Sequence, residues 1–348
     1  MPDATGSVDS AVLAVASRTA LILETNNLRG GDSVAQIVDS LKRIVSELAQ
    51  QSLSPASLAQ WVITHDGLTD EACQQVLALA GRHIDFVRID YSTGYYEAKN
   101  AGFDEVDASR CDYVVFCDAD CRPVHDWLKQ MLLPFARATP DAPVAVAGRT
   151  SYAPGVLGVA LTSIDFIYFP GPLRKGATRN FYANNVAFRY DVFATHHYER
   201  LDGVYRAHCQ VLGLKLQAEG IPIKYAPAAH TMHRIPDTLR ETFKLRWMRG
   251  EDSVGLTPYL VKTYLSRCWQ WLGHSGPIGP LCVLTIRFGV SLRWLNRQLL
   301  PRLGVIRYLG ALVVMAGISA VDMLGALARG VGLSTARRDL ESLSYHRH

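Results

Sequence analysis

Short apolar runs alternate with amphipathic helical patterns in the first third of the chain, and this alternation constrains the fold most strongly. Thr19–Glu24, Gln60–Thr64 and Asp112–Cys117 are predicted strands. Between the first two, apolar residues recur at helical spacing from Val34 to Leu48. Strands that alternate with helices are joined by right-handed crossovers and form a mostly parallel sheet. We therefore predict a Rossmann-like α/β fold with helices on both faces of the sheet.

The pattern becomes mixed in the middle of the chain. Val144–Ala147 and Asn184–Phe188 are predicted strands, and Thr150–Arg179, which is rich in Gly and Pro, is predicted as a loop region. The remaining predicted elements are a helix, a strand and a basic helix: Val211–Glu219, Ile221–Ala226 and Leu239–Arg249.

Charge divides the chain into a near-neutral body and a basic, apolar C-terminal region. The 348 residues carry a formal net charge of +4. Ser253–Val321 contains no Asp or Glu but seven basic residues, so the rest of the chain carries a net −3. We expect an N-terminal tail at 1–18, a main domain at 19–252, a basic helical region at 253–335 and a C-terminal tail at 336–348. The near-neutral body gives no reason to expect a nucleic-acid partner.

Two C-terminal segments are long and apolar. Tyr308–Ala328 has 21 residues and a single charge, Asp322, and is long enough to cross a bilayer. Pro277–Leu300 combines three arginines with Trp294, a composition that suits an anionic membrane surface. The alternative is a C-terminal helical layer packed on the body of the protein. The charge of Asp322 and the glycines near it favour that alternative.

Cysteine usage and the N-terminus bear on the cellular compartment. Seven cysteines without regular spacing indicate reduced thiols rather than a disulfide framework. Asp3 and Asp9 lie where a signal peptide carries positive charge, and the apolar run Ala11–Ala16 is too short for one. We expect a cytoplasmic protein, at the inner face of the cell membrane where its C-terminal region binds lipid.

A carboxylate pair follows the third predicted strand directly. Asp118 and Asp120 come after the apolar run that ends at Cys117, and Asn26 and Asp66 follow the first two strands. Ligands of open α/β sheets bind at this carboxyl edge. Two carboxylates there suit Mg²⁺ or Mn²⁺, with further ligands from a diphosphate. No glycine-rich dinucleotide or P-loop fingerprint accompanies them.

The ordered set of motifs resembles the family 2 glycosyltransferases, which have the GT-A fold. The resemblance covers about residues 18–250, and it implies an inverting hexosyl- or N-acetylhexosaminyltransferase. Such an enzyme uses a nucleotide sugar, most often UDP-linked, and Mn²⁺ or Mg²⁺. The matching pieces are Thr25-Asn26-Asn27, His65 to Asp70, Gly94 to Gly102, Phe116 to Asp120, Asn184–Arg189, Leu214–Gly220, Tyr225 to Pro227 followed by His233, and Arg246 to Gly250.

The resemblance implies roles at the two ends of the nucleotide sugar. Asp66 would accept a hydrogen bond from the nucleotide base, with Thr25 and Asn27 nearby. From its sequence context alone, Asp66 is a turn residue in an Asp-Gly pair. Arg246 and Arg249 lie in a segment that closes over the diphosphate in family members, although a basic helix face exposed to solvent explains them equally well.

The resemblance also implies a metal site. Asp118 would contact the ribose or the metal, and Asp120 would be the principal metal ligand. His233 would lie near the metal and the diphosphate, and His230 competes with it for that role. Lys99 would face the diphosphate or the ribose; the alternative for Lys99 is a solvated helix face.

One departure from the family concerns the catalytic base. The family usually has an Asp six residues before the basic residue of the following helix, but counting back from Lys215 gives His208-Cys209. His208 can serve as the base, because its ordinary pKa of about 6.5 suits proton transfer. Alternatively, the register is shifted and Asp202 or Glu199 is the base. A third explanation is an amine or ionised phosphate acceptor, which needs no strong base.

The sequence leaves the acceptor and two other functions open. Lipid-linked, phosphate, amine and natural-product acceptors all remain. A sugar-phosphate nucleotidyltransferase would need a glycine-rich phosphate loop, of which Leu28 to Gly31 is a poor version. A non-catalytic, membrane-bound protein that binds nucleotide sugars is the other alternative, and it would not hydrolyse the donor.

Overall fold

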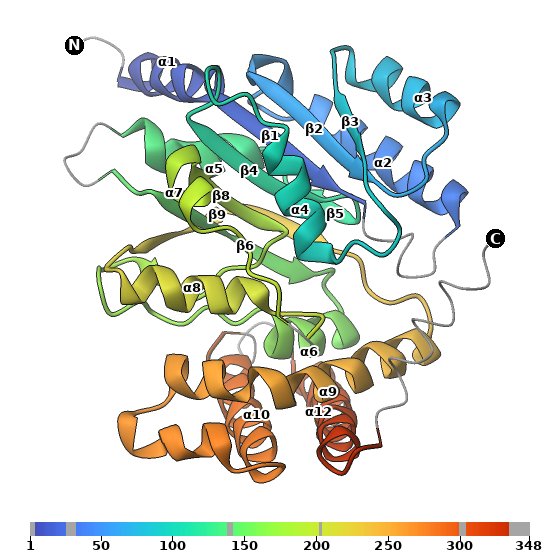
Figure 1. The fold of residues 1–348 in the computed structure, drawn as a ribbon, viewed down its shortest axis with the longest axis vertical. Coiled ribbons are helices and arrows are strands. Elements are labelled where there is room, and N and C mark those ends of the chain that lie inside the picture. Colours follow the sequence, from blue (N-terminus) through green and yellow to red (C-terminus); the bar gives the residue numbers. More distant parts are fainter. Residues whose placement is uncertain (1–3, 26–32, 138–141, 202–203, 299–303, 334–348) are drawn as a thin grey trace. The chain divides into compact units, whose positions relative to one another are not determined.

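The computed structural model describes residues 4–25, 33–137, 142–201, 204–298 and 304–333 (Figure 1). The chain forms two compact units, and it passes from one to the other several times. Unit 1 consists of residues 1–150, 168–200 and 215–233, and unit 2 of residues 151–167, 201–214 and 234–348.

Unit 1 is built on a mixed sheet, which has nine strands within the described residues. β1 (Thr19–Glu24), β2 (Gln60–His65), β3 (Asp85–Arg88) and β4 (Tyr113–Asp118) are parallel, in the order β3-β2-β1-β4. The sheet continues through β8 (Asn185–Arg189), β6 (Ala145–Tyr152), β9 (Ile223–His233) and β5 (Cys121–Pro123), and β7 (Ala177–Thr178) pairs with β9. β8 joins β4 in the antiparallel direction. The predicted α/β fold is therefore confirmed.

Helices flank this sheet. They are α1 (Ala4–Ala16), α2 (Val34–Ala49), α3 (Asp70–Ala80), α4 (Tyr95–Asp104), α5 (Trp127–Ala136), α7 (Tyr190–Thr195), the short 3₁₀ helix η1 (Pro55–Ser57) and the last turn of α8 (His208–Ala218). Polar residues fix where two of them begin. The Ser33 hydroxyl accepts a hydrogen bond from the backbone N–H of Gln36 at the start of α2, and Thr69 caps α3 in the same way.

Unit 2 is helical. Besides the first turns of α8, it contains α6 (Val156–Asp165), α9 (Leu239–Tyr264), the 3₁₀ helix η2 (Arg267–His274), α10 (Ile278–Gln298) and α12 (Val305–Gly330). α9 and α12 touch backbone to backbone. A Cβ on Gly250 would lie 2.0 Å from the Asp322 carbonyl oxygen, and one on Gly325 would lie 2.2 Å from that of Trp247. Only glycine permits this approach.

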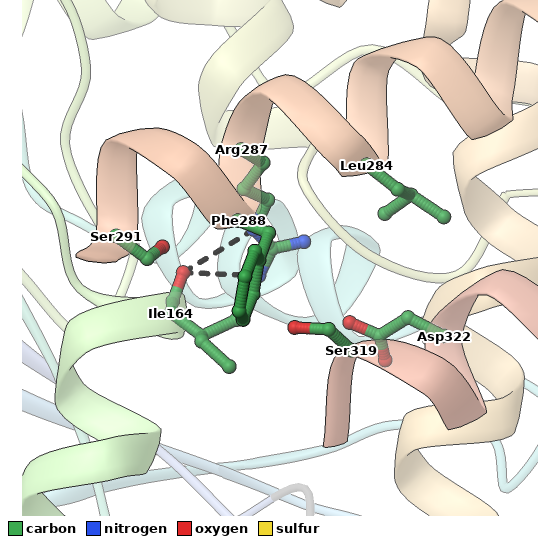
Figure 2. A pocket seen from close by; sticks show the side chains of 7 residues that line it. All are labelled: Ile164, Leu284, Arg287, Phe288, Ser291, Ser319 and Asp322. Atoms are coloured by element: carbon green, nitrogen blue, oxygen red, sulfur yellow. Dashed lines mark hydrogen bonds between the residues drawn. The ribbon is translucent and has the colours of Figure 1, made fainter. Parts of the chain in front are cut away.

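A small pocket lies among α6, α10 and α12 of unit 2 (Figure 2). Asp322 and Ser319 face it from α12, and the Arg287 guanidinium reaches across it to donate to the Ile164 carbonyl at 3.0 Å. Polar groups inside a helical layer are stabilised there because they pair with one another.

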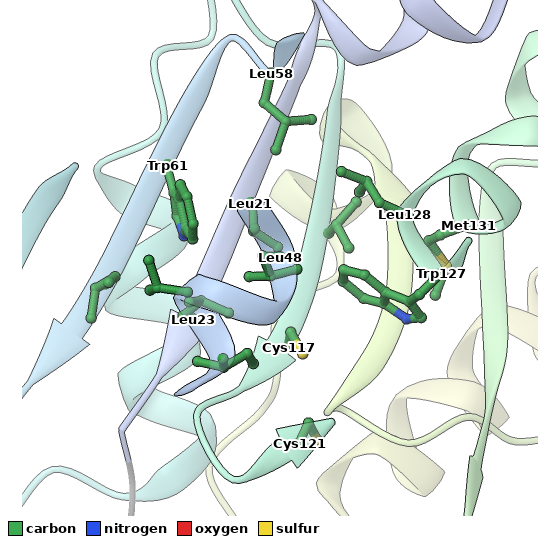
Figure 3. Packing of buried hydrophobic residues seen from close by; sticks show 14 of the residues in the cluster. Leu21, Leu23, Leu48, Leu58, Trp61, Cys117, Cys121, Trp127, Leu128 and Met131 are labelled. Atoms are coloured by element: carbon green, nitrogen blue, oxygen red, sulfur yellow. The ribbon is translucent and has the colours of Figure 1, made fainter. Parts of the chain in front are cut away.

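The main core of unit 1 fills one face of the sheet (Figure 3). Leu21, Leu23, Trp61 and Cys117 point from the strands toward Trp127 and other residues of α2 and α5. Neighbouring residues of a strand point to opposite faces. Asp118, which follows Cys117, therefore points to the other face.

That opposite face is aromatic and is covered by α4 and α7. Phe116 packs against Phe193 with ring centroids 4.8 Å apart, and Phe103 of α4 packs against Phe193 at 4.9 Å. A Cβ on Gly102 of α4 would lie 2.8 Å from Ile22 on β1. This close approach explains the glycine at the end of the Gly94 to Gly102 motif.

Several elements depart from the sequence prediction. The expected loop region Thr150–Arg179 contains α6, whose residues are apolar around almost the whole helix and so lack a helical period. Residues 1–18, expected as a tail, contain α1, in which Val12 and Ala16 are buried. The basic helix predicted to end at Arg249 continues to Tyr264. The expected tail at 336–348 lies outside the described residues.

Candidate functional site

Carboxylates gather at the carboxyl edge of the parallel strands in unit 1. Glu24 at the end of β1 pairs in register with Thr64 of β2 and Asp118 of β4. Glu24 and Asp118 are both buried. The parallel order of β2, β1 and β4 also brings Asp66, directly after β2, to this edge. The structure therefore brings together the acidic residues that the sequence placed at this edge.

Asp118 is held by two donors from α4. The Lys99 ammonium lies 2.5 Å from Asp118 Oδ1, and the Tyr95 hydroxyl donates to Oδ2 at 2.7 Å. Lys99 is completely buried. Burial, followed by the Asp118 charge, raises the pKa of Tyr95 well above its usual value, so Tyr95 stays a neutral donor. Asp118 is thereby fixed in one orientation.

The Gly94 to Gly102 motif explains how α4 presents these donors. The Gly94 backbone N–H donates to Glu97 Oε2 at 2.9 Å and starts the helix. Asn100 exchanges two hydrogen bonds with the Tyr198 backbone, at 2.9 and 3.2 Å. Lys99 lies between these two anchors and therefore points at the sheet rather than at solvent.

Asp120 and His233 complete a cluster that suits a metal ion. One ligand atom each from Asp118, Asp120 and His233 lies within 4.8 Å of the other two. β5 and β9 create this proximity, because Cys121 pairs in register with His233. His233 Nε2 lies 3.4 Å from Asp120 Oδ2. Two carboxylates and an imidazole are a donor set that Mn²⁺ accepts, and Mg²⁺ favours the carboxylates.

His230, the competing histidine, belongs to a different contact. Its Nδ1 lies 3.0 Å from an Arg149 guanidinium nitrogen. Burial, together with the Arg149 charge, lowers the pKa of His230 to about 4, so the ring is neutral at pH 7 and its Nδ1 accepts a hydrogen bond from the guanidinium. His233, rather than His230, joins the carboxylates.

The residues that were expected to bind the nucleotide base are only partly described by the structure. Both carboxylate oxygens of Asp66 are buried. The Thr25 hydroxyl donates to the Thr64 carbonyl at 2.8 Å and ties β1 to β2. His65 Nδ1 accepts from the Leu68 N–H at 3.1 Å, which shapes the turn around Asp66. Asn27 lies outside the described residues.

Arg246 lies in a buried ion-pair network of unit 2. Arg246 is 2% exposed, and its Nε donates to Asp322 Oδ1 at 2.8 Å while Nη1 donates to Asp165 Oδ1 at 2.7 Å. Arg249 and Arg287 also pair with Asp165. Burial opposes the charge of Asp165, but the arginines outweigh burial and hold the pKa of this carboxyl well below its usual range. The expected diphosphate ligands Arg246 and Arg249 thus have carboxylate partners within the protein.

The candidates for the catalytic base differ in their surroundings. His208 is buried, and its Nε2 lies 2.9 Å from the Val204 carbonyl oxygen, which requires the proton on Nε2 and makes Nδ1 the basic nitrogen. Glu199 is exposed and pairs with Lys215 at 2.8 Å. Asp202 lies outside the described residues.

Strain marks the segment that leads into His208. Ala207 has a φ of 67°, a left-handed conformation that is unusual for a residue with a Cβ. The Asp252 carboxylate accepts hydrogen bonds from the backbone N–H groups of Tyr205 and Arg206, each at 3.1 Å. These bonds within unit 2 hold the strained segment in place.

Sequence reasoning missed Tyr95, Glu24 and Arg149. Tyr95 stands inside the motif that we had identified, next to Gly94, but nothing in its spacing reveals the bond to Asp118. Glu24 is the last residue of an apolar strand and is buried beside the site, a position that could have drawn attention to it. Arg149 lies at the end of a short apolar run and gives no comparable signal.

Comparisons with known proteins agree with this geometry. Residues 35–196 match the model of "Glycosyl transferase family 2". No curated protein matches the chain. The structure is similar to the mannosyltransferase PcManGT from Pyrobaculum calidifontis in complex with GDP-Man and Mn²⁺, with a TM-score of 0.54 and 14% sequence identity. This match covers 93% of the present chain and 96% of the other, and it establishes the fold as GT-A.

Proposed function

Because residues 35–196 match the model of glycosyl transferase family 2, we propose that the chain is a metal-dependent, inverting glycosyltransferase. It moves a sugar from a nucleotide sugar to an acceptor. The cluster of Asp118, Asp120 and His233 at the carboxyl edge of the sheet carries the proposal. The similar fold of a mannosyltransferase that binds GDP-Man and Mn²⁺ supports it.

The residues of the cluster have separate tasks in this proposal. Asp120 and His233 hold Mn²⁺ or Mg²⁺, with Asp118 as the third ligand. When bound, the ion supplies positive charge that stabilises the departing nucleoside diphosphate. Lys99 and Tyr95 keep the Asp118 carboxylate oriented, so that it need not reorganise when the donor binds.

Asp66 recognises the nucleotide base in this proposal, beside Thr25 and Asn27. An ionised carboxylate only accepts hydrogen bonds, and uracil and guanine both present N–H donors to it. We propose a UDP-linked donor, with GDP-mannose as the comparison that the mannosyltransferase suggests. Arg246 and Arg249 stabilise unit 2 in this proposal, because Asp165 and Asp322 already pair with them.

The acceptor in this proposal needs no strong base. Six residues before Lys215, where the family has its base, stands Cys209 rather than a carboxylate, and His208 is its neighbour. An amine or an ionised phosphate arrives as an active nucleophile. If the acceptor is a hydroxyl, His208 Nδ1 is the atom that takes its proton.

The test of the metal site compares two aspartates of unit 1. Wild type should be stabilised by UDP or GDP only with Mn²⁺ present, because a bound ligand raises the free energy of unfolding. Asp120→Ala should abolish this thermal shift. The exposed Asp126, whose side chain makes no cap hydrogen bond to α5, serves as the control in Asp126→Ala. An unchanged shift in Asp120→Ala would contradict the metal assignment.

Donor hydrolysis separates the transferase from the alternatives. An active transferase releases sugar slowly to water when Mn²⁺ and the correct donor are present. Binding of a nucleotide sugar without any release of sugar would favour the non-catalytic binding protein. Formation of a nucleotide sugar from a sugar phosphate and a nucleoside triphosphate would favour the nucleotidyltransferase.

We also propose that unit 2 lies on an anionic membrane surface, at the cytoplasmic face. Two helices are long and apolar enough to cross a bilayer, Ile278–Asn296 and Val305–Gly330, although core helices of soluble proteins pass the same test. One face of α12 is buried and includes Met315 and Asp322. The opposite face is apolar and exposed, as at Ile306 (87%) and Val313 (73%).

The ion pair of Asp322 favours an interfacial position over a crossing one. A crossing α12 would place Asp322 in hydrocarbon, where charged groups are costly, or separate it from Arg246. An interfacial α12 keeps the pair and buries only its exposed face in lipid. The exposed tryptophans Trp269 and Trp271 suit the same interface.

Vesicle flotation tests the membrane proposal. Wild type should bind vesicles with anionic lipid and be released by alkaline carbonate, which spares helices that cross the bilayer. Val313→Glu should reduce binding, whereas Leu79→Glu, an exposed apolar position of α3 in unit 1, should not. Binding that ignores lipid charge and both substitutions would contradict the proposal.

A further inference from the structure

We propose that unit 1 carries a binding site for a phosphate group of the acceptor, centred on Arg149. The inference rests on the proposed transferase function and names the class of its acceptor. It is carried by the position of Arg149 in the sheet, by the contacts that hold its side chain, and by the charge of the surrounding strands.

Arg149 lies in the same row of the sheet as Asp118. β8 runs antiparallel to both β4 and β6, where Cys117 pairs with Asn185 and Ala147 pairs with Val186. Continuing both registers toward the start of β8 places Asn184 opposite Asp118 on one side and opposite Arg149 on the other. The Asn185 side chain also reaches this part of β6, because its Nδ2 donates to the Arg149 carbonyl at 2.8 Å. Neighbouring strands lie about 4.8 Å apart, so the two backbones are about 10 Å from each other.

Arg149 also points to the same face of the sheet as Asp118. Cys117, Val146 and Ala229 belong to the core on one face. Alternation along each strand sends Asp118, Arg149 and His230 to the other face. The contact between Arg149 and His230, at 3.0 Å, agrees with this assignment. The guanidinium is therefore presented toward the side of the sheet on which Asp118 lies.

Neighbouring side chains position Arg149 without neutralising it. His230 is neutral at pH 7, since burial with the nearby Arg149 charge lowers its pKa to about 4, and it accepts one N–H of the guanidinium. Tyr168 fixes the backbone on both sides, because its hydroxyl donates to the Gly148 carbonyl at 2.7 Å and accepts from the Thr150 N–H at 3.0 Å. The Arg149 side chain itself is exposed. It is an oriented cation that can still bind an anion.

Aromatic rings lie beside Arg149. Tyr168 and Tyr225 are stacked with ring centroids 4.5 Å apart. Burial raises the pKa of Tyr225 to about 12, and the Arg149 charge opposes this rise.

The surrounding strands carry only positive charge. Within unit 1, residues 142–150, 168–190 and 220–233 contain no Asp or Glu. These segments build β6, β7, β8 and β9. Apart from Arg189, which lies at the far end of β8 and pairs with Asp191, their cations are Arg149, Arg174, Lys175, Arg179 and Lys224. This region thus contrasts with the acidic edge formed by Glu24, Asp118 and Asp120. A dianionic phosphate fits the basic region, and an amine acceptor would be repelled from it.

A phosphate acceptor also accounts for Cys209, rather than a carboxylate, six residues before Lys215. A phosphate monoester is largely dianionic at pH 7, because its second pKa is about 6. One of its oxygens attacks the anomeric carbon of the donor and forms the new C–O bond. The bond from that carbon to the nucleoside diphosphate breaks, and the diphosphate leaves with the electron pair. No proton has to be removed in this step.

Calorimetry with small probes tests the proposal. Wild type, saturated with Mn²⁺ and the preferred nucleoside diphosphate, should bind octyl phosphate and should not bind octanol. Arg149→Ala should weaken octyl phosphate binding about 10-fold or more, the usual scale for a charged hydrogen bond. Arg149→Lys should keep part of the affinity. Arg189→Ala is the matched control, because Arg189 pairs in register with Tyr113 at the opposite end of β4 from Asp118.

The outcomes separate this proposal from the proposed function. If wild type shows no Mn²⁺-dependent nucleotide shift, the transferase proposal fails by itself. If the shift is present but Arg149→Ala binds octyl phosphate like wild type, the acceptor site is wrong. Weakened nucleotide binding in Arg149→Ala would assign Arg149 to the donor instead and also overturn it. Octyl phosphate, glucose 6-phosphate and inorganic phosphate then show whether a lipid, a sugar or the phosphate alone is recognised.

Discussion

Replacing Asp322 by alanine removes one of the two carboxylates that hold Arg246 inside unit 2. Arg246 then loses the bond from Nε, which is 2.8 Å long, and the second bond from Nη2 to the same carboxylate. Because Arg246 is only 2% exposed, water does not readily take the place of the carboxylate. Asp165 remains, but Arg249 and Arg287 share it.

The loss in the free energy of unfolding follows from the balance of charges around Arg246. Three arginines and two aspartates give the network a formal charge of +1, and the substitution raises it to +2. Removing one partner of a buried ion pair costs about 3–5 kcal/mol. We expect about 3 kcal/mol for Asp322→Ala, since Asp165 still compensates part of the Arg246 charge. Asp322→Asn keeps the side-chain volume and one hydrogen-bond acceptor, so it should lower the free energy of unfolding by less than Asp322→Ala does.

Urea unfolding of a double-mutant cycle measures how much the ion pair between Arg246 and Asp322 contributes to the free energy of unfolding. Arg246→Met and Asp322→Leu should each destabilise, whereas the double variant should recover at least about 2 kcal/mol, because apolar residues often replace buried ion pairs at little cost. Circular dichroism of the helical signal gives the transition. If the two substitutions add within about 0.5 kcal/mol, the ion pair does not stabilise unit 2 and the reasoning is refuted.

Three further outcomes can be measured directly. Asp66→Ala should weaken nucleoside diphosphate binding by about 1–3 kcal/mol in calorimetry, the cost of an unpaired buried donor, and an unchanged affinity would make Asp66 a turn residue only. His208→Ala should keep most of the transfer rate to a phosphate acceptor, whereas a loss of about 10²–10⁴ in kcat would show that His208 is a general base. Because burial lowers the pKa of His230 to about 4, while the unfolded chain binds this proton below about 6.5, the free energy of unfolding should fall as pH decreases from 6.5 to 4. His230→Gln should flatten this part of the stability profile, and an unaltered profile would contradict the buried, neutral histidine.

Local signals were sufficient to predict the parallel half of the sheet. The predicted strand Thr19–Glu24 coincides with β1, because its apolar run is bounded by turn residues on the C-terminal side. Asp118 and Asp120 could be placed at the sheet edge for the same reason, since they follow such a strand directly. The order of β8, β6, β9 and β5 could not be predicted, because it depends on pairings between residues far apart in the chain.

The carboxylate partners of the buried cations could not be predicted, for a common physical reason. Lys99 and Arg246 both have solvated helix faces as the default interpretation, since lysine and arginine are rarely buried without a partner. Their partners are distant in sequence: Asp118 is 19 residues from Lys99, and Asp322 is 76 residues from Arg246. Sequence patterns report the period of one helix and carry no information on which distant carboxylate it meets.

The pairing of Lys99 with Asp118 changes what the metal site can attract. The ammonium offsets the Asp118 charge at 2.5 Å, so Asp120 supplies the remaining carboxylate charge of the cluster. One net negative charge is a weak attraction for a divalent ion, which prefers several anionic oxygens. A nucleoside diphosphate brings those oxygens with it. We therefore expect the ion and the nucleotide to bind together, with Asp118 oriented in advance, rather than the ion to occupy the site alone.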